Sequence, residues 1–234
     1  MNVNKWQAVI FDLDDTLYPE RDYVLSGFHA VAEWAEAHLS IPAEQGWAEL
    51  RAYFEAGIRG DTFNRWLIQH NLEPEPLVPQ LIKVYREHQP HIAAFPEVPD
   101  LLARLRRAYR IGLVSDGYLE GQQRKITALA LAPYFDAIVF SDEWGRTAWK
   151  PSPRPFEIAL ERLQVAAAQS VYVADNPVKD FLGARAAGLA TVQVLRSDGE
   201  YAARLPPSAE HAPDRVIATL DELEFTLKQM EPHL

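Results

Sequence analysis

The sequence predicts an α/β fold, in which helices cover both faces of a parallel sheet and a small all-helical unit is inserted into the chain. From residue 100 onward, helical segments alternate with short apolar runs, which is typical of a parallel sheet. Before that, residues 23–87 are helical in pattern almost throughout. Because this helical stretch follows an isolated apolar run, the expected sheet domain is discontinuous in sequence.

The first apolar run, Ala8–Phe11, is predicted to be a buried strand, and three carboxylates follow it at Asp12, Asp14 and Asp15. Open α/β sheets bind ligands at the carboxyl ends of their strands. Asp12 and Asp14 are two residues apart, so in extended geometry they point the same way and can share a Mg²⁺ ion, which prefers oxygen ligands. A turn held by side-chain-to-backbone hydrogen bonds is the alternative interpretation of this motif.

The inserted stretch predicts four short helices, because apolar residues recur at three- and four-residue spacing between Pro, Gly and Asn breaks. The first begins at Tyr23, and the others are expected over residues 43–56, 61–69 and 75–87. Further helices are expected over residues 100–108, 119–130, 155–163, 178–187 and 221–230. Strands are expected over residues 110–115, 137–140, 171–174 and 191–194. Residues 197–213 are expected to form a loop.

Composition narrows the class of protein. The 234 residues, 48% of them hydrophobic, suffice for one domain with an insertion or for two small domains. The N-terminus lacks the pattern of a signal peptide, and no apolar run approaches the length of a membrane span. We therefore expect a cytoplasmic protein without a membrane partner, and the sequence indicates no particular oligomeric state.

Charge and cysteine content restrict the chemistry. There is no cysteine, so any covalent chemistry must use oxygen or nitrogen side chains. The formal charge of −10, with no basic cluster larger than residues 104–107, argues against nucleic acid as a partner. A small phosphorylated metabolite is still compatible with this negative charge, because metal and lysine charges at a binding site outweigh the net charge of the protein there.

Polar residues recur where later strands or loops end. Residues 115–117 (Ser-Asp-Gly) follow a strand and precede a helix, where a hydroxyl and turn amides can hold phosphate. Lys150 lies in a loop before proline, and Asp175 and Asp180 flank a helix start. Each has a simpler interpretation, as an ordinary turn, an exposed lysine and a helix cap. Their ordered occurrence at successive positions favours a common site.

The ordered motifs F-D-L-D-D-T-L, V-S-D-G, K-P and V-A-D-N-P-x-x-D-x-x-G-A-x-x-A-G resemble those of the haloacid dehalogenase superfamily, in its phosphatase branch with a helical cap. The resemblance extends from residue 9 to about residue 195. It implies a Rossmann-like catalytic core of residues 1–17 and 94–234, with a helical cap at residues 18–93. The cap itself carries no motif that can be assigned.

The resemblance also implies residue roles. Asp12 would be the nucleophile that forms an aspartyl phosphate, and Asp14 the general acid and then the general base. Mg²⁺ would be held by the Asp12 carboxylate, the backbone carbonyl of Asp14 and Asp175, with Asp180 supporting these ligands.

In the same resemblance, Thr16 would steady the nucleophile loop and Lys150 would pair with both nucleophile and phosphate. Ser115 would hydrogen-bond the phosphoryl group, with Asp116 and Gly117 supporting it. One departure from the family pattern is that Ala174 stands where glycine is usual.

The expected activity is therefore a Mg²⁺-dependent phosphomonoesterase that acts on a small phosphorylated metabolite, such as a sugar phosphate or a nucleotide monophosphate. The acid at Asp14 argues against a dehalogenase, because expelling halide needs no proton donor. A phosphomutase of the same superfamily and a catalytically idle binding protein are the alternatives.

Substrate selection is expected in the cap, through residues that could contact the leaving group. The basic and aromatic candidates are Arg21, Tyr23, Arg51, Arg59, Arg65 and Trp66. Surface arginines and core aromatics are the competing interpretation of these residues.

Overall fold

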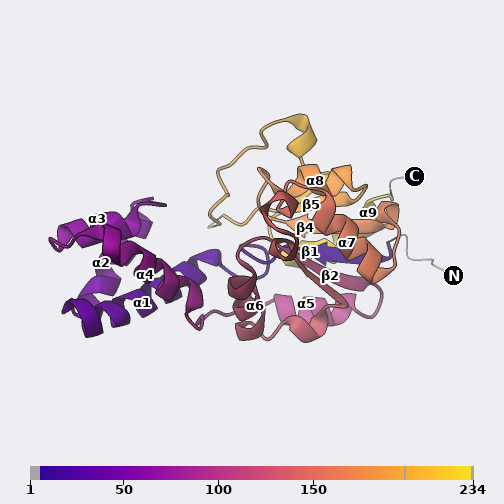
Figure 1. The fold of residues 1–234 in the computed structure, drawn as a ribbon. Helices are drawn as coiled ribbons and strands as arrows, with labels where there is room; N and C mark the ends of the chain where they lie inside the picture. The colour runs from indigo at the N-terminus through magenta and orange to yellow at the C-terminus, as the bar shows by residue number, and fades with distance from the viewer. Residues whose placement is uncertain (1–5, 198, 233–234) are drawn as a thin grey trace. The chain divides into compact units, whose positions relative to one another are not determined.

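The computed structural model of the chain describes residues 6–197 and 199–232. These fall into two compact units, and the boundaries lie between Glu20 and Arg21 and between Ile92 and Ala93. The larger unit holds the sheet, and the smaller holds the inserted helices (Figure 1). The predicted loop includes Asp198, and the predicted core includes residues 1–5, 233 and 234; all of these lie outside the described residues.

The larger unit is built on a six-stranded sheet whose paired strands are all parallel. The predicted α/β class, with a Rossmann-like parallel sheet, is confirmed. The strands are β1 (Ala8–Phe11), β2 (Arg110–Ser115), β3 (Ala137–Phe140), β4 (Ser170–Ala174), β5 (Ala190–Val194) and β6 (Arg215–Ile217).

Strand order in the sheet is β3-β2-β1-β4-β5-β6. The chain builds outward from β1 through β2 to β3, and then returns to place β4 on the other side of β1. In register, Phe11 of β1 lies beside Leu113 of β2 and Val173 of β4. The order of strands therefore reverses between β1 and β4, and such a switch point leaves a crevice at the carboxyl ends of the two strands.

Helices cover both faces of this sheet. Ala8 and Ile10 of β1 belong to a buried cluster with residues of α7 (Arg154–Leu163) and α8 (Asp180–Ala186). Val9 and Phe11 alternate to the other face, as a strand requires, and are also fully buried. Other helices of this unit are α5 (Val98–Leu105), α6 (Leu119–Ala128) and α9 (Leu223–Gln229). Continuous burial of β1 is what a two-sided parallel sheet demands.

The C-terminal part differs from the sequence prediction at β6 and just before α9. The short strand β6 was not predicted, because only Ile217 of its three residues is buried and so few residues show no periodicity. After it, a 3₁₀ turn at Leu220–Glu222 precedes α9 in place of one continuous helix. The Thr219 hydroxyl and the Glu222 carboxylate form a capping box there, which explains the early start of the turn.

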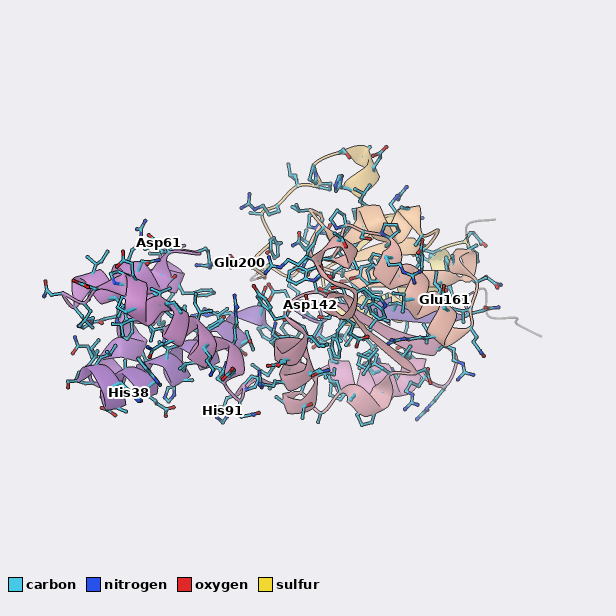
Figure 2. All side chains as sticks on the ribbon, in the orientation of Figure 1. His38, Asp61, His91, Asp142, Glu161 and Glu200 are labelled. Atoms are coloured by element: carbon cyan, nitrogen blue, oxygen red, sulfur yellow. The ribbon has the colours of Figure 1, made fainter. Side chains whose placement is uncertain are left out.

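The smaller unit contains four helices among its described residues, as predicted: α1 (Glu20–Leu39), α2 (Ala43–Glu55), α3 (Thr62–Gln69) and α4 (Pro74–Glu87). Its own apolar core includes Phe28, Leu50, Trp66 and Leu81. Figure 2 labels His38, near the end of α1, and Asp61, the residue before α3. Independent burial of these side chains means that the insertion has a core of its own.

Among the described residues, no helix combines the length and apolar character needed to cross a membrane.

Close packing ties α8 to the loop that carries Lys150. A Cβ added to Gly183 of α8 would lie 2.4 Å from the carbonyl oxygen of Pro151 and 2.7 Å from that of Ser152. Backbone atoms cannot yield as a flexible side chain can. Only glycine therefore lets this helix approach the loop so closely.

Gly183→Ala should lower the free energy of unfolding by roughly 1–3 kcal/mol, because the added methyl forces helix and loop apart. Thermal unfolding measures the loss. Gly46→Ala is the matched control, since its Cβ would meet side-chain atoms instead of backbone, with Trp66 at 3.0 Å and Ala32 at 3.4 Å. Equal unfolding midpoints for Gly183→Ala and the unsubstituted protein would contradict this packing constraint.

Candidate active site

Three buried carboxylates meet at the carboxyl ends of β1 and β4. Asp12 directly follows β1, Asp175 directly follows β4, and Asp180 begins α8. One carboxylate oxygen from each lies within 4.8 Å of the others. The backbone amide of Asp12 donates to the carbonyl of Val173 at 2.9 Å, which fixes the end of β1 against β4. The switch point thus concentrates negative charge in the protein interior.

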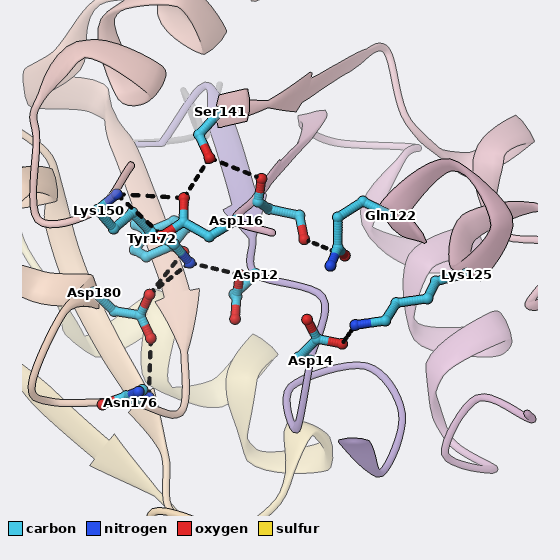
Figure 3. Close-up of polar contacts among 11 residues, drawn as sticks. Asp12, Asp14, Asp116, Gln122, Lys125, Ser141, Lys150, Tyr172, Asn176 and Asp180 are labelled. Atoms are coloured by element: carbon cyan, nitrogen blue, oxygen red, sulfur yellow. Dashed lines mark hydrogen bonds and ion pairs between the residues drawn. The ribbon is translucent and has the colours of Figure 1, made fainter. Parts of the chain in front are cut away.

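The Lys150 ammonium lies inside this acidic cluster (Figure 3). Its Nζ donates to Asp12 Oδ1 at 2.6 Å, to Asp180 Oδ1 at 2.7 Å and to the Tyr172 hydroxyl at 3.0 Å. The lysine side chain is 0% exposed. A buried ammonium is costly unless it is paired, so this one must be compensated by the two carboxylates.

Asp116 positions the loop that carries this lysine. Its carboxylate accepts a hydrogen bond from the Lys150 backbone amide at 3.0 Å and another from the Ser141 hydroxyl at 2.6 Å. Asp142, labelled in Figure 2, accepts from the Leu119 amide at 3.0 Å and from Trp149 Nε1 at 3.1 Å. Two carboxylates therefore fasten the residues around Lys150 to neighbouring segments.

The cluster contains more carboxylates than ammonium groups, and this excess shifts the pKa of its members. Burial raises the pKa of Asp12 to about 6, against the opposing effect of Lys150, and Asp180 adds to the rise. Burial, with Asp180 and Asp12 nearby, holds the pKa of Asp175 well above its usual range. Burial alone would lower the pKa of Lys150, but Asp12 and Asp180 hold it well above its usual range. Two ammonium groups, Lys150 and the nearby Lys179, face three carboxylates, so a further cation would be stabilised here.

The donor set fits a hard divalent cation. No described residue donates a hydrogen bond to the Asp175 carboxylate, while the backbone carbonyl of Asp175 accepts from Gln193 Nε2 at 2.9 Å. Asp180, by contrast, has both oxygens engaged, because Oδ2 accepts from the Asn176 amide at 3.0 Å. Asp12 and Asp175 therefore retain oxygens for a metal, and oxygen ligands suit Mg²⁺.

Asp14 lies beside the cluster and has its own cationic partner. Its Oδ1 accepts from Lys125 Nζ at 2.7 Å and from the Tyr18 hydroxyl. Burial would raise the pKa of Asp14, but Lys125 and Tyr18 outweigh it and the pKa is lowered. Two aspartates two residues apart thus have opposite pKa shifts, because their charged and hydrogen-bonding neighbours differ.

The remaining predicted loop residues have well-defined surroundings. The Ser115 hydroxyl donates to Gln122 Oε1 at 2.9 Å, and Gly117 has a φ of +124° beside the same glutamine. Asp15 accepts from the backbone amides of Glu20 at 2.8 Å and Glu200 at 3.0 Å. In the described part of the chain, the buried hydroxyl of Thr16 has no hydrogen-bond partner.

The cap candidates occupy ordinary positions within the helical unit. Arg21 and Arg51 both pair with Glu55, at 2.8 Å each, and Arg65 pairs with Asp61 at 2.9 Å. Tyr23 packs against Tyr85 and His88, the guanidinium of Arg59 lies over Phe54, and fully buried Trp66 donates to Glu49 at 2.8 Å. The arginines are thus paired on the surface, and Trp66 is a core residue.

Four residues near the predicted site were missed by sequence reasoning: Tyr18, Gln122, Lys125 and Tyr172. Gln122 and Lys125 are three apart on α6 and share its buried face with Ile126. A lysine on the apolar face of a helix was the available signal for a buried partner. Tyr172 gave none, because an aromatic in a buried strand is ordinary packing.

Residues 9–194 match the family described as haloacid dehalogenase-like hydrolase. The chain belongs to this family. The predicted superfamily and the predicted hydrolase class are therefore confirmed.

Relatives of this hydrolase have phosphatase names. A glyceraldehyde 3-phosphate phosphatase from Methanopyrus kandleri is 31% identical over 232 residues, covering 96% of this chain and 98% of that protein. A phosphoserine phosphatase from Thermus thermophilus is 30% identical, with 81% and 76% covered. The crystal structure of a HAD phosphatase from Thermococcus onnurineus matches with a TM-score of 0.61 at 25% identity, covering 94% of this chain and 97% of that one.

Mg²⁺ should raise the thermal unfolding midpoint of the hydrolase more at about pH 7.5 than at about pH 5. With its pKa raised to about 6, Asp12 favours the folded state at low pH, and this contribution is lost as pH rises through about 6. A cation can replace the proton only above that range. Differential scanning fluorimetry with and without Mg²⁺ measures both midpoints.

Asp175→Asn should raise the midpoint measured without metal, because it removes a buried repulsive charge, and should remove the response to Mg²⁺. Asp100→Asn, an exposed aspartate of α5, is the control and should change neither. A full Mg²⁺ response in Asp175→Asn would exclude Asp175 as a ligand.

Proposed function

We propose that the protein is a Mg²⁺-dependent phosphomonoesterase that hydrolyses a small phosphorylated metabolite, such as a sugar phosphate or nucleotide monophosphate, through an aspartyl phosphate on Asp12. The observation that carries the proposal is the pairing of Asp12 with buried Lys150 beside a second, separately held acid, Asp14. The phosphatase names of relatives that span nearly the whole chain support the same reaction class.

In the first step, a carboxylate oxygen of Asp12 attacks phosphorus while the bond from phosphorus to the leaving oxygen breaks. Lys150 donates to Asp12 Oδ1, which holds the nucleophile carboxylate in place. Ser115 would donate its hydroxyl to a phosphoryl oxygen, supported by Asp116 and Gly117, and Thr16 would steady the loop. Positioning and electrostatics of this kind dominate phosphoryl transfer.

Asp14 gives the leaving oxygen its proton in that step, so that the product departs as an alcohol. In the second step it takes a proton from water as the water oxygen attacks phosphorus, and the bond to Asp12 breaks to release phosphate. Asp14 is therefore both general acid and general base. This residue is the reason for preferring phosphate ester hydrolysis to halide displacement.

A Mg²⁺ ion would be held by the Asp12 carboxylate, the Asp14 backbone carbonyl and Asp175. When bound, it neutralises charge between the nucleophile and the anionic phosphoryl group. Asp180 supports the set indirectly, because its two oxygens orient Lys150 and the Asn176 amide.

Selection among metabolites is proposed to lie in the cap, with Arg21 and Tyr23 as the first candidates because they follow the nucleophile loop most closely in sequence. Arg51, Arg65 and Trp66 are the next candidates. The cytoplasm stays the expected compartment, and a small metabolite the expected partner.

Phosphate release from 4-nitrophenyl phosphate should require Mg²⁺ and stop with excess chelator. Asp12→Asn should abolish it, because the amide has the same size but no anionic oxygen, and Asp14→Asn should slow it by about 10²–10⁴-fold. A malachite green assay over a panel of phosphorylated metabolites measures release, with Asp100→Asn as the control. Chelator-resistant turnover, near-normal activity of Asp12→Asn, or interconversion of sugar phosphates without net release would contradict the proposal.

Arg21→Ala and Tyr23→Phe should lower kcat/KM for the best metabolite of that panel by about ten- to a hundredfold, as expected for one lost polar contact. The loss on 4-nitrophenyl phosphate should be much smaller, since that substrate shares only the phosphoryl group. Lys83→Ala, an exposed residue of α4, is the control. Equal losses on the two substrates would assign these residues to the fold instead of to selection.

A further inference from the structure

The Asp14 carboxylate is held asymmetrically. Lys125 Nζ, 2.7 Å away, and the Tyr18 hydroxyl both donate to Oδ1, and Figure 3 shows the lysine reaching this carboxylate from α6. No described residue donates to Oδ2. One oxygen is thus engaged by two donors, and the other has no hydrogen-bond donor among the described residues.

Both donors are fixed by burial. Lys125 is 3% exposed and Tyr18 is 0% exposed, and the ammonium lies 5.9 Å from the centre of the Tyr18 ring. Tyr18 follows Asp14 by four residues, and the two residues form an isolated parallel bridge in the backbone. With backbone and both donors restrained, the carboxylate has one preferred orientation. Surface ion pairs do not fix geometry in this way.

The same face of α6 reaches a second predicted catalytic position. Gln122 accepts from the Ser115 hydroxyl, and Lys125, one turn later, pairs with Asp14. Both side chains are buried although the helix is polar overall. A single helix face therefore orients one residue from each of the first two motifs.

We infer that Lys125 and Tyr18 are positioning residues that hold Oδ1 of Asp14, so that Oδ2 is the oxygen that carries the proton to the leaving group. The inference rests on the proposed function and deepens it. In the step concerned, the bond from Asp12 to phosphorus forms, the bond from phosphorus to the leaving oxygen breaks, and the proton moves from Asp14 Oδ2 to that oxygen. A proton donor rotated away from this line gives poor transfer.

A purely structural ion pair would give a different kinetic result. Loss of packing or of the phosphoryl site lowers kcat/KM by the same factor whatever the leaving group. Loss of orientation at the general acid matters most when the leaving oxygen is strongly basic, because a weakly basic nitrophenolate departs without a proton. Dependence on the leaving group therefore separates positioning from folding.

The experiment measures kcat/KM for 4-nitrophenyl, phenyl and butyl phosphate with Lys125→Met and Tyr18→Phe. Methionine keeps most of the lysine volume without the ammonium, and phenylalanine removes only the hydroxyl. We expect the loss on butyl phosphate to exceed the loss on 4-nitrophenyl phosphate by about tenfold or more, the same trend that Asp14→Asn should give. Combined with Asp14→Asn, Lys125→Met should add little further loss, because both changes disable one proton donor. Gln123→Met, at an exposed position of α6, is the matched control.

Equal losses on all three substrates, or no loss on any, would overturn the inference while leaving the proposed function intact. Failure of the unsubstituted protein to hydrolyse any of the three esters or the metabolite panel would instead reject the proposed function. If Lys125→Met does not fold, as judged by near-ultraviolet circular dichroism, Tyr18→Phe decides the question alone, because its ring packing is unchanged.

Discussion

The arrangement at the catalytic edge depends on one buried ammonium among carboxylates. Lys150 lies 2.6 Å from Asp12 and 2.7 Å from Asp180, with its side chain removed from water. Two buried carboxylates would repel each other without this ammonium, and a buried ammonium is costly without the carboxylates. Two other residues hold Lys150 in place. Asp116 accepts a hydrogen bond from the lysine backbone amide, and Gly183 lets α8 approach the loop that carries the lysine.

Topology explains why the charges converge here. Because the strand order reverses between β1 and β4, the two strands end side by side, and such a reversal leaves a crevice at their carboxyl ends. Asp12 and Asp175 follow these two strands directly. Residues 163 positions apart in sequence therefore become neighbours, as parallel pairing requires, and an excess of negative charge results that favours a cation.

The two acids Asp12 and Asp14 have different pKa shifts because their neighbouring groups differ. Burial dominates at Asp12 and raises its pKa, whereas Lys125 and Tyr18 prevail at Asp14 and lower its pKa. The division follows from α6, whose buried polar face reaches Asp14. A scaffold helix thus contributes to the chemistry through Gln122 and Lys125, neither of which belongs to a recognised motif.

The sequence alone determined the α/β class, five of the six strands in the described residues, and the motif residues that meet at the strand ends, because burial patterns and turn residues are local signals. It missed β6, which is too short and too exposed to show a period. Only the tertiary structure decided which side chains pair: Lys125 with Asp14, Tyr172 with Lys150 and Gln122 with Ser115. It also decided that Trp66 lies in a core. These contacts join distant segments, and a side chain's partner depends on the packing of whole helices and strands, which no short stretch of sequence encodes.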